Sequence, residues 1–282
     1  MSNSFGIDIP AATDVDPVAA ARAAEELGYD FVSTSDHPSG TAPSNETWTM
    51  LTWIAAHTSR IGVMPRVLGV PYRNPAMVAK MAETLDRLAG GRLILGLGGG
   101  ASDEEFRAFG IRVPPPRDKV DGLAEAIQVI RGLWVEPAFT YTGRIHHVVD
   151  APMEPKPARR IPIWVGTFGP RALDVTGRLA DGWMPSLGYA PLDRLPGMRA
   201  RIGAAAEAAG RSPSDITCAL NVEVYVGAER QGVVSGPAQR VAERLRALVA
   251  MGFTVLNLKP AGPDRQEQVE RLALDVLPAV RS

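Results

Sequence analysis

Residues 61–100 read IGVMPRVLGVPYRNPAMVAKMAETLDRLAGGRLILGLGGG, and this stretch decides the fold class. A short apolar run is followed by a turn, a long segment with apolar residues at helical spacing, and a second apolar run. The predicted parts are a strand at 61–68, a helix start at Asn74-Pro75, a helix at 76–88, a helix end at Gly90-Gly91 and a strand at 92–97. The stretch therefore predicts a strand, its crossover helix and the next parallel strand.

The same alternation of strand and helix continues in both directions from this stretch. Further strands are predicted at 4–9, 30–34, 163–165, 182–185, 216–226 and 254–259, and further helices at 18–27, 46–58, 116–134, 170–179, 191–209, 237–251 and 263–280. About eight such units are the repeat of a (β/α)8 or TIM barrel. An open doubly wound sheet is the alternative, but residues 9–12 read IPAA and lack the glycines of a dinucleotide fingerprint. We therefore predict a TIM barrel, with residues 1–282 as a single domain.

One segment, 136–160, interrupts this rhythm. Apolar residues on both sides of Gly143 predict a β-hairpin, and Pro152, Pro155 and Pro157 follow it. His146 and His147 are adjacent in the predicted hairpin, so their side chains should point to opposite faces. The segment is predicted to be an excursion before the fifth barrel strand.

Composition excludes several classes of function. The 30 Lys and Arg residues nearly balance the 31 Asp and Glu residues, and the net charge of -1 disfavours a nucleic-acid partner. Cys218 is the single cysteine, which excludes an internal disulfide and fits a reducing compartment. The chain has neither a basic and apolar leader nor an apolar run of about 18–20 residues. We therefore expect a cytoplasmic protein that does not enter membranes.

Polar residues and glycines at the carboxyl ends of the strands are the candidates for function, because barrel enzymes work at that end. Asp36 and His37 follow the second strand, where they form either an acid–base pair or an ordinary loop turn. Two glycine loops follow the fourth and fifth strands. They consist of Gly98, Gly99 and Gly100, and of Gly166, Thr167, Phe168 and Gly169. Such loops either hold a phosphate on backbone N–H groups or simply make a tight turn.

Two other kinds of chemistry are weighed against these candidates. Lys259 ends the last strand, where an aldolase of this fold would place a Schiff-base lysine, or where a lysine lies at the solvent rim. The four histidines, at 37, 57, 146 and 147, show no metal-ligand spacing, and we expect no metal.

Several motifs together resemble the luciferase-like monooxygenase superfamily. In chain order they are Asp36-His37, YRNP at 72–75, AK at 79–80, TLDRL at 84–88, GRL at 91–93, LGLGGG at 95–100, IRGLW at 130–134, YTG at 141–143, PIWVG at 162–166 and ADGW at 180–183. This resemblance implies a TIM barrel that binds FMN or the deazaflavin coenzyme F420. The Gly-x-x-Gly-Pro-Arg form of 166–171 and the ADGW that follows resemble the F420-dependent branch more closely than the luciferases.

The resemblance also implies roles for individual residues. Asp36 and His37 match residues beside the deazaflavin ring, and His37 becomes the acid or base for the proton that accompanies hydride transfer. Both glycine loops match the phosphate-binding segments. A non-proline cis peptide is implied near Arg66 and Val67, against the back of the ring. Where sugar-phosphate dehydrogenases of the branch share a glutamate after the glycine loop, this chain has Ala101, so that specific activity does not follow.

The function implied is hydride transfer between coenzyme F420 and a small organic substrate. The alternatives are an FMN-dependent monooxygenase that uses reduced flavin and oxygen, and a flavin-binding protein without catalysis. The family resemblance also implies a homodimer.

Overall fold

Parallel strands form a barrel in the computed structural model, which describes residues 3–281. Going around the sheet, the order is β3-β2-β1-β12-β10-β9-β8-β5-β4. These strands are β1 (Ser4–Asp8), β2 (Phe31–Thr34), β3 (Gly62–Pro65), β4 (Leu68–Gly69), β5 (Leu95–Gly98), β8 (Ile163–Val165), β9 (Gly182–Trp183), β10 (Thr217–Val226) and β12 (Val255–Pro260). A parallel bridge between Val63 and Leu93 brings β3 next to β5 and nearly closes the ring. The predicted TIM barrel is confirmed.

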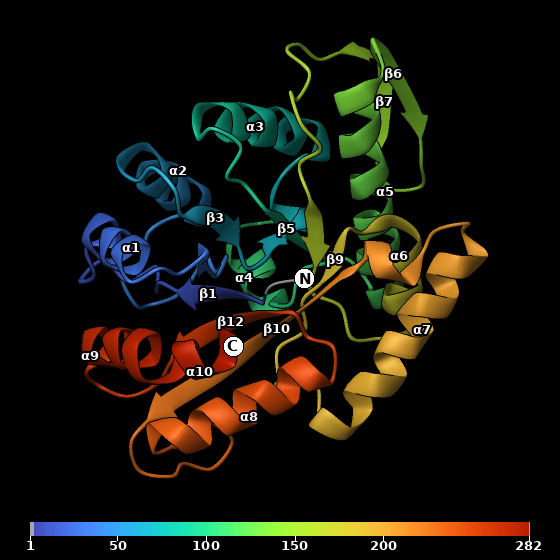
Figure 1. Cartoon of the computed structure of the whole chain (residues 1–282). Coiled ribbons are helices and arrows are strands. Elements are labelled where there is room, and N and C mark those ends of the chain that lie inside the picture. The colour runs from blue at the N-terminus through green and yellow to red at the C-terminus, as the bar shows by residue number, and fades with distance from the viewer. Residues whose placement is uncertain (1–2, 282) are drawn as a thin grey trace.

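Helices surround the strands on the outside (Figure 1). They are α1 (Pro17–Glu26), α2 (Thr47–His57), α3 (Pro75–Leu88), α4 (Asp103–Ala108), α5 (Pro116–Val135), α6 (Pro170–Leu179), α7 (Leu195–Ala208), α8 (Ala238–Ala250), α9 (Arg265–Arg271) and α10 (Leu277–Arg281). Proline at or next to the first helical position begins α1, α3, α5, α6 and α7, because its fixed φ suits that position. Among the described residues, no helix has the length and apolar character needed to cross a membrane.

The third barrel strand is predicted at 61–68, and Pro65 and Gly69 predict a bulge or sharp bend in it. It is divided into β3 and β4, and a non-proline cis peptide joins Arg66 to Val67 between them. The cis peptide lies where the family resemblance placed it. β3 pairs parallel with β2 and β4 pairs parallel with β5, so the two parts run in the same direction and the predicted irregularity of this strand is confirmed.

Three smaller differences concern the division and the number of elements. The helix predicted at 263–280 is divided into α9, a π-helical turn at Leu272–Val276 and α10. The helix predicted at 191–209 begins with a separate 3-10 turn at Leu192–Arg194. The short strand β11 (Val234–Gly236), which pairs with the end of β10, was not predicted because three residues carry no usable periodicity.

The predicted excursion is a two-stranded hairpin of β6 (Ala138–Thr142) and β7 (His147–Pro152). Its turn is fixed to α5 by Glu125, whose carboxylate accepts three backbone N–H bonds at 2.8 Å, from Arg144, Ile145 and His146. The side chain of His147 is exposed, whereas His146 is half-buried with no hydrogen-bond partner for its Nε2. The hairpin and the opposite orientations of the two histidines are confirmed.

Two apolar layers hold the barrel together. The larger one lies between strands and helices, and a smaller cluster fills the interior of the barrel. The interior cluster consists of Phe31, Met64, Trp164, Met184, Ala219 and Val255, with Val67 and Ile94 packed against it. Because side chains fill the interior, a ligand has room only above this cluster, where the strands end.

Candidate active site

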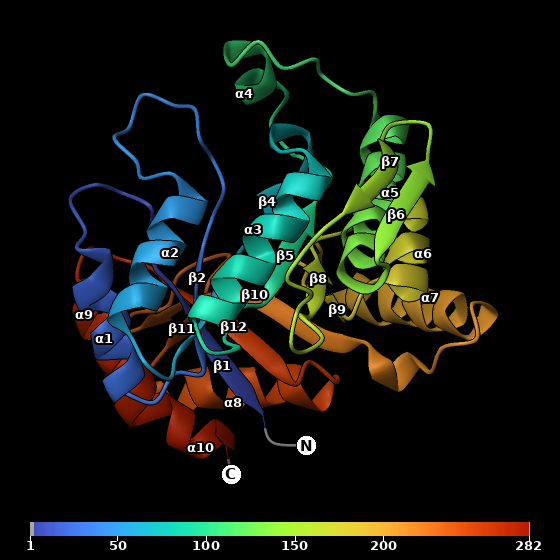
Figure 2. The same ribbon diagram turned by 90° about the horizontal axis from the view of Figure 1, so that it is seen from above.

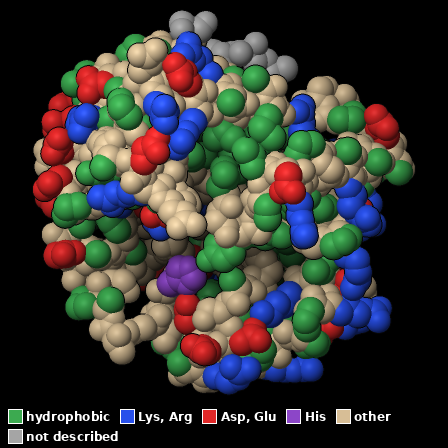
Figure 3. Space-filling view, turned by 90° about the horizontal axis from the view of Figure 1, so that it is seen from below, with side chains coloured by type: hydrophobic (Ala, Val, Ile, Leu, Met, Phe, Trp, Pro, Cys, Tyr) green, Lys and Arg blue, Asp and Glu red, His purple; other side chains and the backbone are tan. Residues whose placement is uncertain are grey.

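The carboxyl ends of the barrel strands lie at one end of the molecule, which we call the mouth. There α4 and the long loop between β2 and α2 extend beyond the strands (Figure 2). The space-filling view of one side of the molecule shows a hollow in its lower half, with a histidine side chain and acidic and basic side chains beside it (Figure 3).

Asp36 lies in the loop after β2 with its side chain turned into the protein. Its carboxylate accepts a hydrogen bond from the Gly69 backbone N–H at 2.9 Å and pairs with Arg73 at 2.7 and 3.0 Å. Arg73 also contacts Glu46 at 2.5 Å. Burial opposes the charge of Arg73, but its hydrogen bonds to Asp36 and Glu46 outweigh that effect and raise the pKa of Arg73. Asp36 thereby fixes the β2 loop to the turn after β4.

His37, the next residue, faces the opposite way. Its side chain is 59% exposed, and its Nδ1 lies 2.8 Å from Oε1 of Glu105 in α4. The other oxygen of Glu105 accepts a hydrogen bond from the Tyr72 hydroxyl at 2.9 Å. Burial, the hydrogen bond to Glu105 and the negative charges of Glu105 and Asp36 raise the pKa of Tyr72. The carboxylate beside His37 is therefore that of Glu105, which comes from a different loop.

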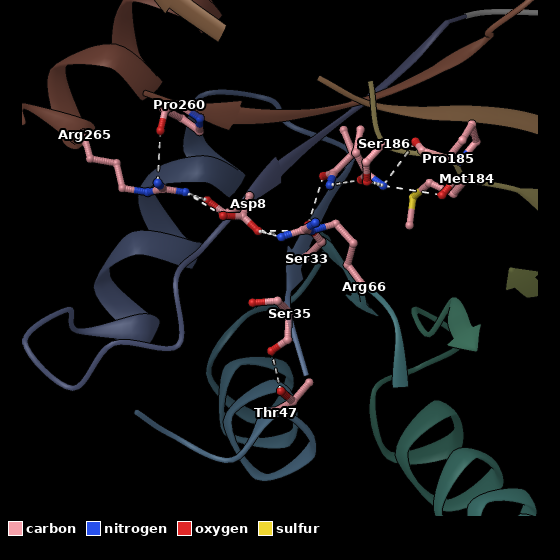
Figure 4. A network of polar contacts seen from close by, with 12 residues as sticks. Asp8, Ser33, Ser35, Thr47, Arg66, Met184, Pro185, Ser186, Pro260 and Arg265 are labelled. Atoms are coloured by element: carbon pink, nitrogen blue, oxygen red, sulfur yellow. Dashed lines mark hydrogen bonds and ion pairs between the residues drawn. The ribbon is translucent and has the colours of Figure 1, made fainter. Parts of the chain in front are cut away.

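Arg66, at the cis peptide, points away from the interior cluster toward the end of β1. It donates to Asp8 at 3.0 and 3.3 Å, and Arg265 donates to the other oxygen of Asp8 at 2.9 Å (Figure 4). Arg265 also bonds to the carbonyl oxygen of Pro260 at 3.1 Å. The guanidinium groups of Arg66 and Arg265 thus share the buried carboxylate of Asp8. These three side chains connect β1, β3, β12 and the start of α9.

Val67, the second residue of the cis peptide, explains part of the first glycine loop. A Cβ at Gly98 would lie 2.6 Å from a methyl group of Val67, and a Cβ at Gly99 would lie 3.0 Å from the carbonyl oxygen of Lys119. Gly100 has a φ of +87°, and a Cβ there would lie 2.4 Å from the ring of Phe106. A Cβ at Gly98 or Gly100 would therefore force neighbouring atoms to shift, and a Cβ at Gly99 would make a tight contact with the backbone of α5.

The second glycine loop is open by comparison. A Cβ at Gly166 would meet nothing closer than 3.6 Å, and one at Gly169 would meet no atom within 4 Å. Gly169 is the N-cap of α6 and supplies no side-chain hydrogen bond to that helix end. The Thr167 hydroxyl contacts Thr176 at 2.7 Å and its carbonyl oxygen accepts from Trp183, whereas Phe168 is partly exposed. This loop presents backbone atoms and an uncapped helix start to solvent.

A chain of polar side chains crosses the barrel above the interior cluster. Ser33 donates to Asn257 at 3.0 Å, Asn257 donates to Asn221 at 2.8 Å, and Asn221 donates to Ser186 at 3.2 Å (Figure 4). Ser33, Asn257 and Asn221 come from three barrel strands and are buried. They place hydrogen-bonding groups below the mouth.

Several of these residues were not predicted as site residues. They are Asp8, Tyr72, Glu105, Asn221, Asn257 and Arg265. Asp8 and Asn257 carry a usable signal, since each is a polar residue near the carboxyl end of a strand. Lys259 is exposed on β12. Within 3–281, no three His, Cys, Asp or Glu side chains gather as metal ligands do.

The comparisons with known proteins give the family. The protein-family model described as luciferase-like monooxygenase matches residues 15–235, and the chain belongs to this family. It is 29% identical to an F420-dependent glucose-6-phosphate dehydrogenase of Kineococcus radiotolerans, over 92% of this chain and 90% of that protein. It is 31% identical to a protein of the same name from Nakamurella multipartita, over 92% of this chain and 74% of that one.

Solved structures support the same fold. An F420-dependent secondary alcohol dehydrogenase in complex with an F420-acetone adduct superposes with a TM-score of 0.90 at 20% identity, and the match covers 100% of both chains. At this level of identity the likeness concerns the barrel and the order of its elements.

Proposed function

We propose that this chain is a coenzyme F420-dependent oxidoreductase that transfers a hydride between the deazaflavin and a small organic substrate at the barrel mouth. The observation that carries this proposal is the open loop from Gly166 to Gly169 before α6. The two relatives compared above are both named F420-dependent glucose-6-phosphate dehydrogenase. When bound, the deazaflavin supplies the hydride chemistry, and the protein supplies binding, orientation and a group for the proton.

The residues of the mouth fit a deazaflavin coenzyme that carries a phosphate. The uncapped start of α6, with the backbone N–H groups of its first turn, suits a phosphate, because helix N-termini bind anions. Gly166 and Gly169 leave space for it to approach. Gly98, Gly99 and Gly100 border the same mouth, and in this proposal they contribute backbone atoms while their missing side chains make room for Val67, Lys119 and Phe106.

Val67 lies beside both glycine loops, with a methyl group 2.6 Å from the Cβ position of Gly98 and 3.6 Å from that of Gly166, and Arg66 precedes it at the cis peptide. Val67 packs on the interior cluster, so its apolar side chain forms the surface on which a flat ring system rests. Arg66 acts through Asp8, which fixes the direction of the segment around the cis peptide. In this arrangement Asp36 holds the loop that carries His37, and His37 takes up or gives back the proton.

Cofactor binding tests the proposal directly. Purified apoprotein is titrated with coenzyme F420 and, separately, with FMN, with fluorescence and thermal unfolding as the two readouts. We expect F420 to bind and to raise the melting temperature, because a ligand that binds only the folded state stabilises it. Binding of FMN alone would replace the proposal by a flavin monooxygenase, and binding of neither would remove the cofactor from it.

His37→Ala then separates catalysis from simple binding. We expect turnover to fall by about 10²–10⁴-fold, the usual contribution of a general acid or base, with little change in F420 affinity. His57→Ala is the matched control, because His57 is a histidine of α2 whose Nδ1 contacts the carbonyl oxygen of Trp53. Unchanged turnover in His37→Ala would assign the proton to a different group, whereas F420 binding without turnover in the wild type would favour a binding protein without catalysis.

The assembly and location of the protein are part of the same proposal. We propose a cytoplasmic homodimer that binds no nucleic acid, with α2 and α3 at the interface. Three large apolar side chains on these helices are 56–73% exposed: Trp53, Met77 and Leu88. Sedimentation of the wild type and of Trp53→Glu tests this, since the charge should shift a dimer toward monomer.

A further inference from the structure

We propose that Glu105 is a positioning residue for His37. Its carboxylate accepts a hydrogen bond from the Nδ1–H of His37, and this fixes the imidazole tautomer whose Nε2 has the free lone pair. The role of this contact in turnover rests on the proposed function, whereas the contact itself does not.

The chemistry of the two partners determines the direction of this bond. Nδ1 of His37 lies 2.8 Å from Oε1 of Glu105, a hydrogen-bonding distance. An ionised carboxylate can only accept, so Nδ1 must carry the hydrogen. In a neutral imidazole the other nitrogen, Nε2, is then unprotonated. His37 is 59% exposed, so Nε2 has no need of a protein partner and is free for a substrate.

The side chain of Glu105 is fixed by burial and by further hydrogen bonds, which distinguishes its contact with His37 from a chance surface contact. Its side chain is only 13% exposed, and its second oxygen accepts from the Tyr72 hydroxyl at 2.9 Å. The Ser102 hydroxyl caps α4 by accepting from the backbone N–H of Glu105 at 3.3 Å. Both carboxylate oxygens are therefore engaged, one with Tyr72 and one with His37.

The short helix that carries Glu105 is anchored at several points. Phe106 is fully buried and packs against Tyr72, with ring centroids 4.8 Å apart. Asp103 forms an ion pair with Lys119 of α5 at 2.6 Å, and the ammonium group of Lys119 lies 5.5 Å from the Phe106 ring centre. These contacts fix the position of α4 over the mouth, so the backbone that carries Glu105 is held in place beside His37.

The position of this carboxylate also bears on Ala101. Ala101 is exposed and has no acid–base group, so the start of this loop supplies no carboxylate to the mouth. Glu105, four residues further along in α4, supplies one beside His37. With bound deazaflavin to accept a hydride from a carbon that bears a hydroxyl group, the hydroxyl proton would move to Nε2 of His37, and Glu105 would stabilise the resulting imidazolium.

Nitrogen-15 NMR of the histidine rings tests the contact without cofactor or substrate. At about pH 9 imidazoles are neutral, and the shifts of the two ring nitrogens identify the tautomer. We expect His37 to be protonated at Nδ1, with its signals assigned by their loss in His37→Asn. His57 is the internal reference, because its Nδ1 contacts a carbonyl oxygen at 2.8 Å and must also carry the hydrogen. A wild-type His37 protonated at Nε2 overturns the proposal.

Three variants complete the test. Glu105→Ala should shift His37 toward the Nε2–H tautomer and lower kcat at least about tenfold with F420 affinity unchanged. Glu105→Gln keeps an accepting oxygen and should retain the tautomer. Glu104→Ala, an exposed glutamate of the same helix, should change neither readout. A tautomer unchanged in Glu105→Ala overturns the proposal. If no turnover with F420 is found, the NMR result still stands, so the two proposals fail separately.

Discussion

The two glycine loops at the mouth look alike in the sequence and differ in the structure. At Gly98, Gly99 and Gly100 the space of the missing side chain is taken by Val67, Lys119 and Phe106. At Gly166 and Gly169 that space is open. A glycine in a sequence shows only that no side chain is present, whereas the structure shows what occupies its place. The first loop is therefore shaped by packing, and the second is the better phosphate site.

Gly100→Ala should give the largest effect on stability. We expect a loss of about 3 kcal/mol, because alanine at positive φ costs about 1–2 kcal/mol and overlap with a buried ring adds a similar amount. Gly110→Ala is the matched control, since Gly110 has a φ of +68° with no atom near its Cβ position. Urea unfolding measures both. Equal losses in the two variants would show that the Phe106 contact contributes nothing.

Gly98→Ala tests whether Val67 is the side chain that excludes a Cβ. In the single variant the free energy of unfolding should fall by about 1–3 kcal/mol, because the added methyl group overpacks against Val67. Adding Val67→Ala should recover part of that loss, with a coupling energy of about 1 kcal/mol in a double-mutant cycle. Val241→Ala, a buried valine of α8, is the control and should be additive with Gly98→Ala. Additivity of the Val67 pair would contradict the packing explanation.

The packing around a glycine depends on residues far away in the chain, whereas side-chain periodicity is local. This difference explains which features of the structure were predictable from the sequence. The strand–helix rhythm depends on side-chain periodicity within each segment, so the barrel and the hairpin follow from the sequence. The position of the cis peptide came from family resemblance, since Pro65 and Gly69 indicated only an irregular strand. The π-helical turn at Leu272–Val276 has no sequence signal that distinguishes it from an α-helix.

Side-chain partners at the mouth were the least predictable part. Asp36 and His37 are adjacent, which suggested an acid–base pair, but side chains of adjacent residues in extended chain point in opposite directions. Asp36 therefore pairs with Arg73, and His37 meets Glu105, which is 68 residues away. Only the folded arrangement of three loops brings Glu105 and Tyr72 to His37.

Gly169→Ala should have the smallest effect on stability and is the sharpest test of the comparison. Gly169 has a φ of -76°, which alanine adopts without strain, and its Cβ would meet no atom within 4 Å. We expect the free energy of unfolding to stay within about 0.5 kcal/mol of the wild type, as for ordinary surface changes. The added methyl group occupies space that the proposal gives to the cofactor phosphate, so F420 affinity should fall about tenfold, or about 1.4 kcal/mol.

Gly203→Ala in α7 is the control for this measurement, because its Cβ would make only an ordinary 3.6 Å contact with Pro213. It should leave F420 affinity unchanged in the same fluorescence titration. If Gly169→Ala binds F420 as the wild type does, the open loop is not the phosphate site, and the packed loop at Gly98–Gly100 becomes the alternative despite its filled spaces. A loss of affinity in Gly169→Ala without loss of stability would separate ligand binding from packing, which the glycine pattern alone cannot do.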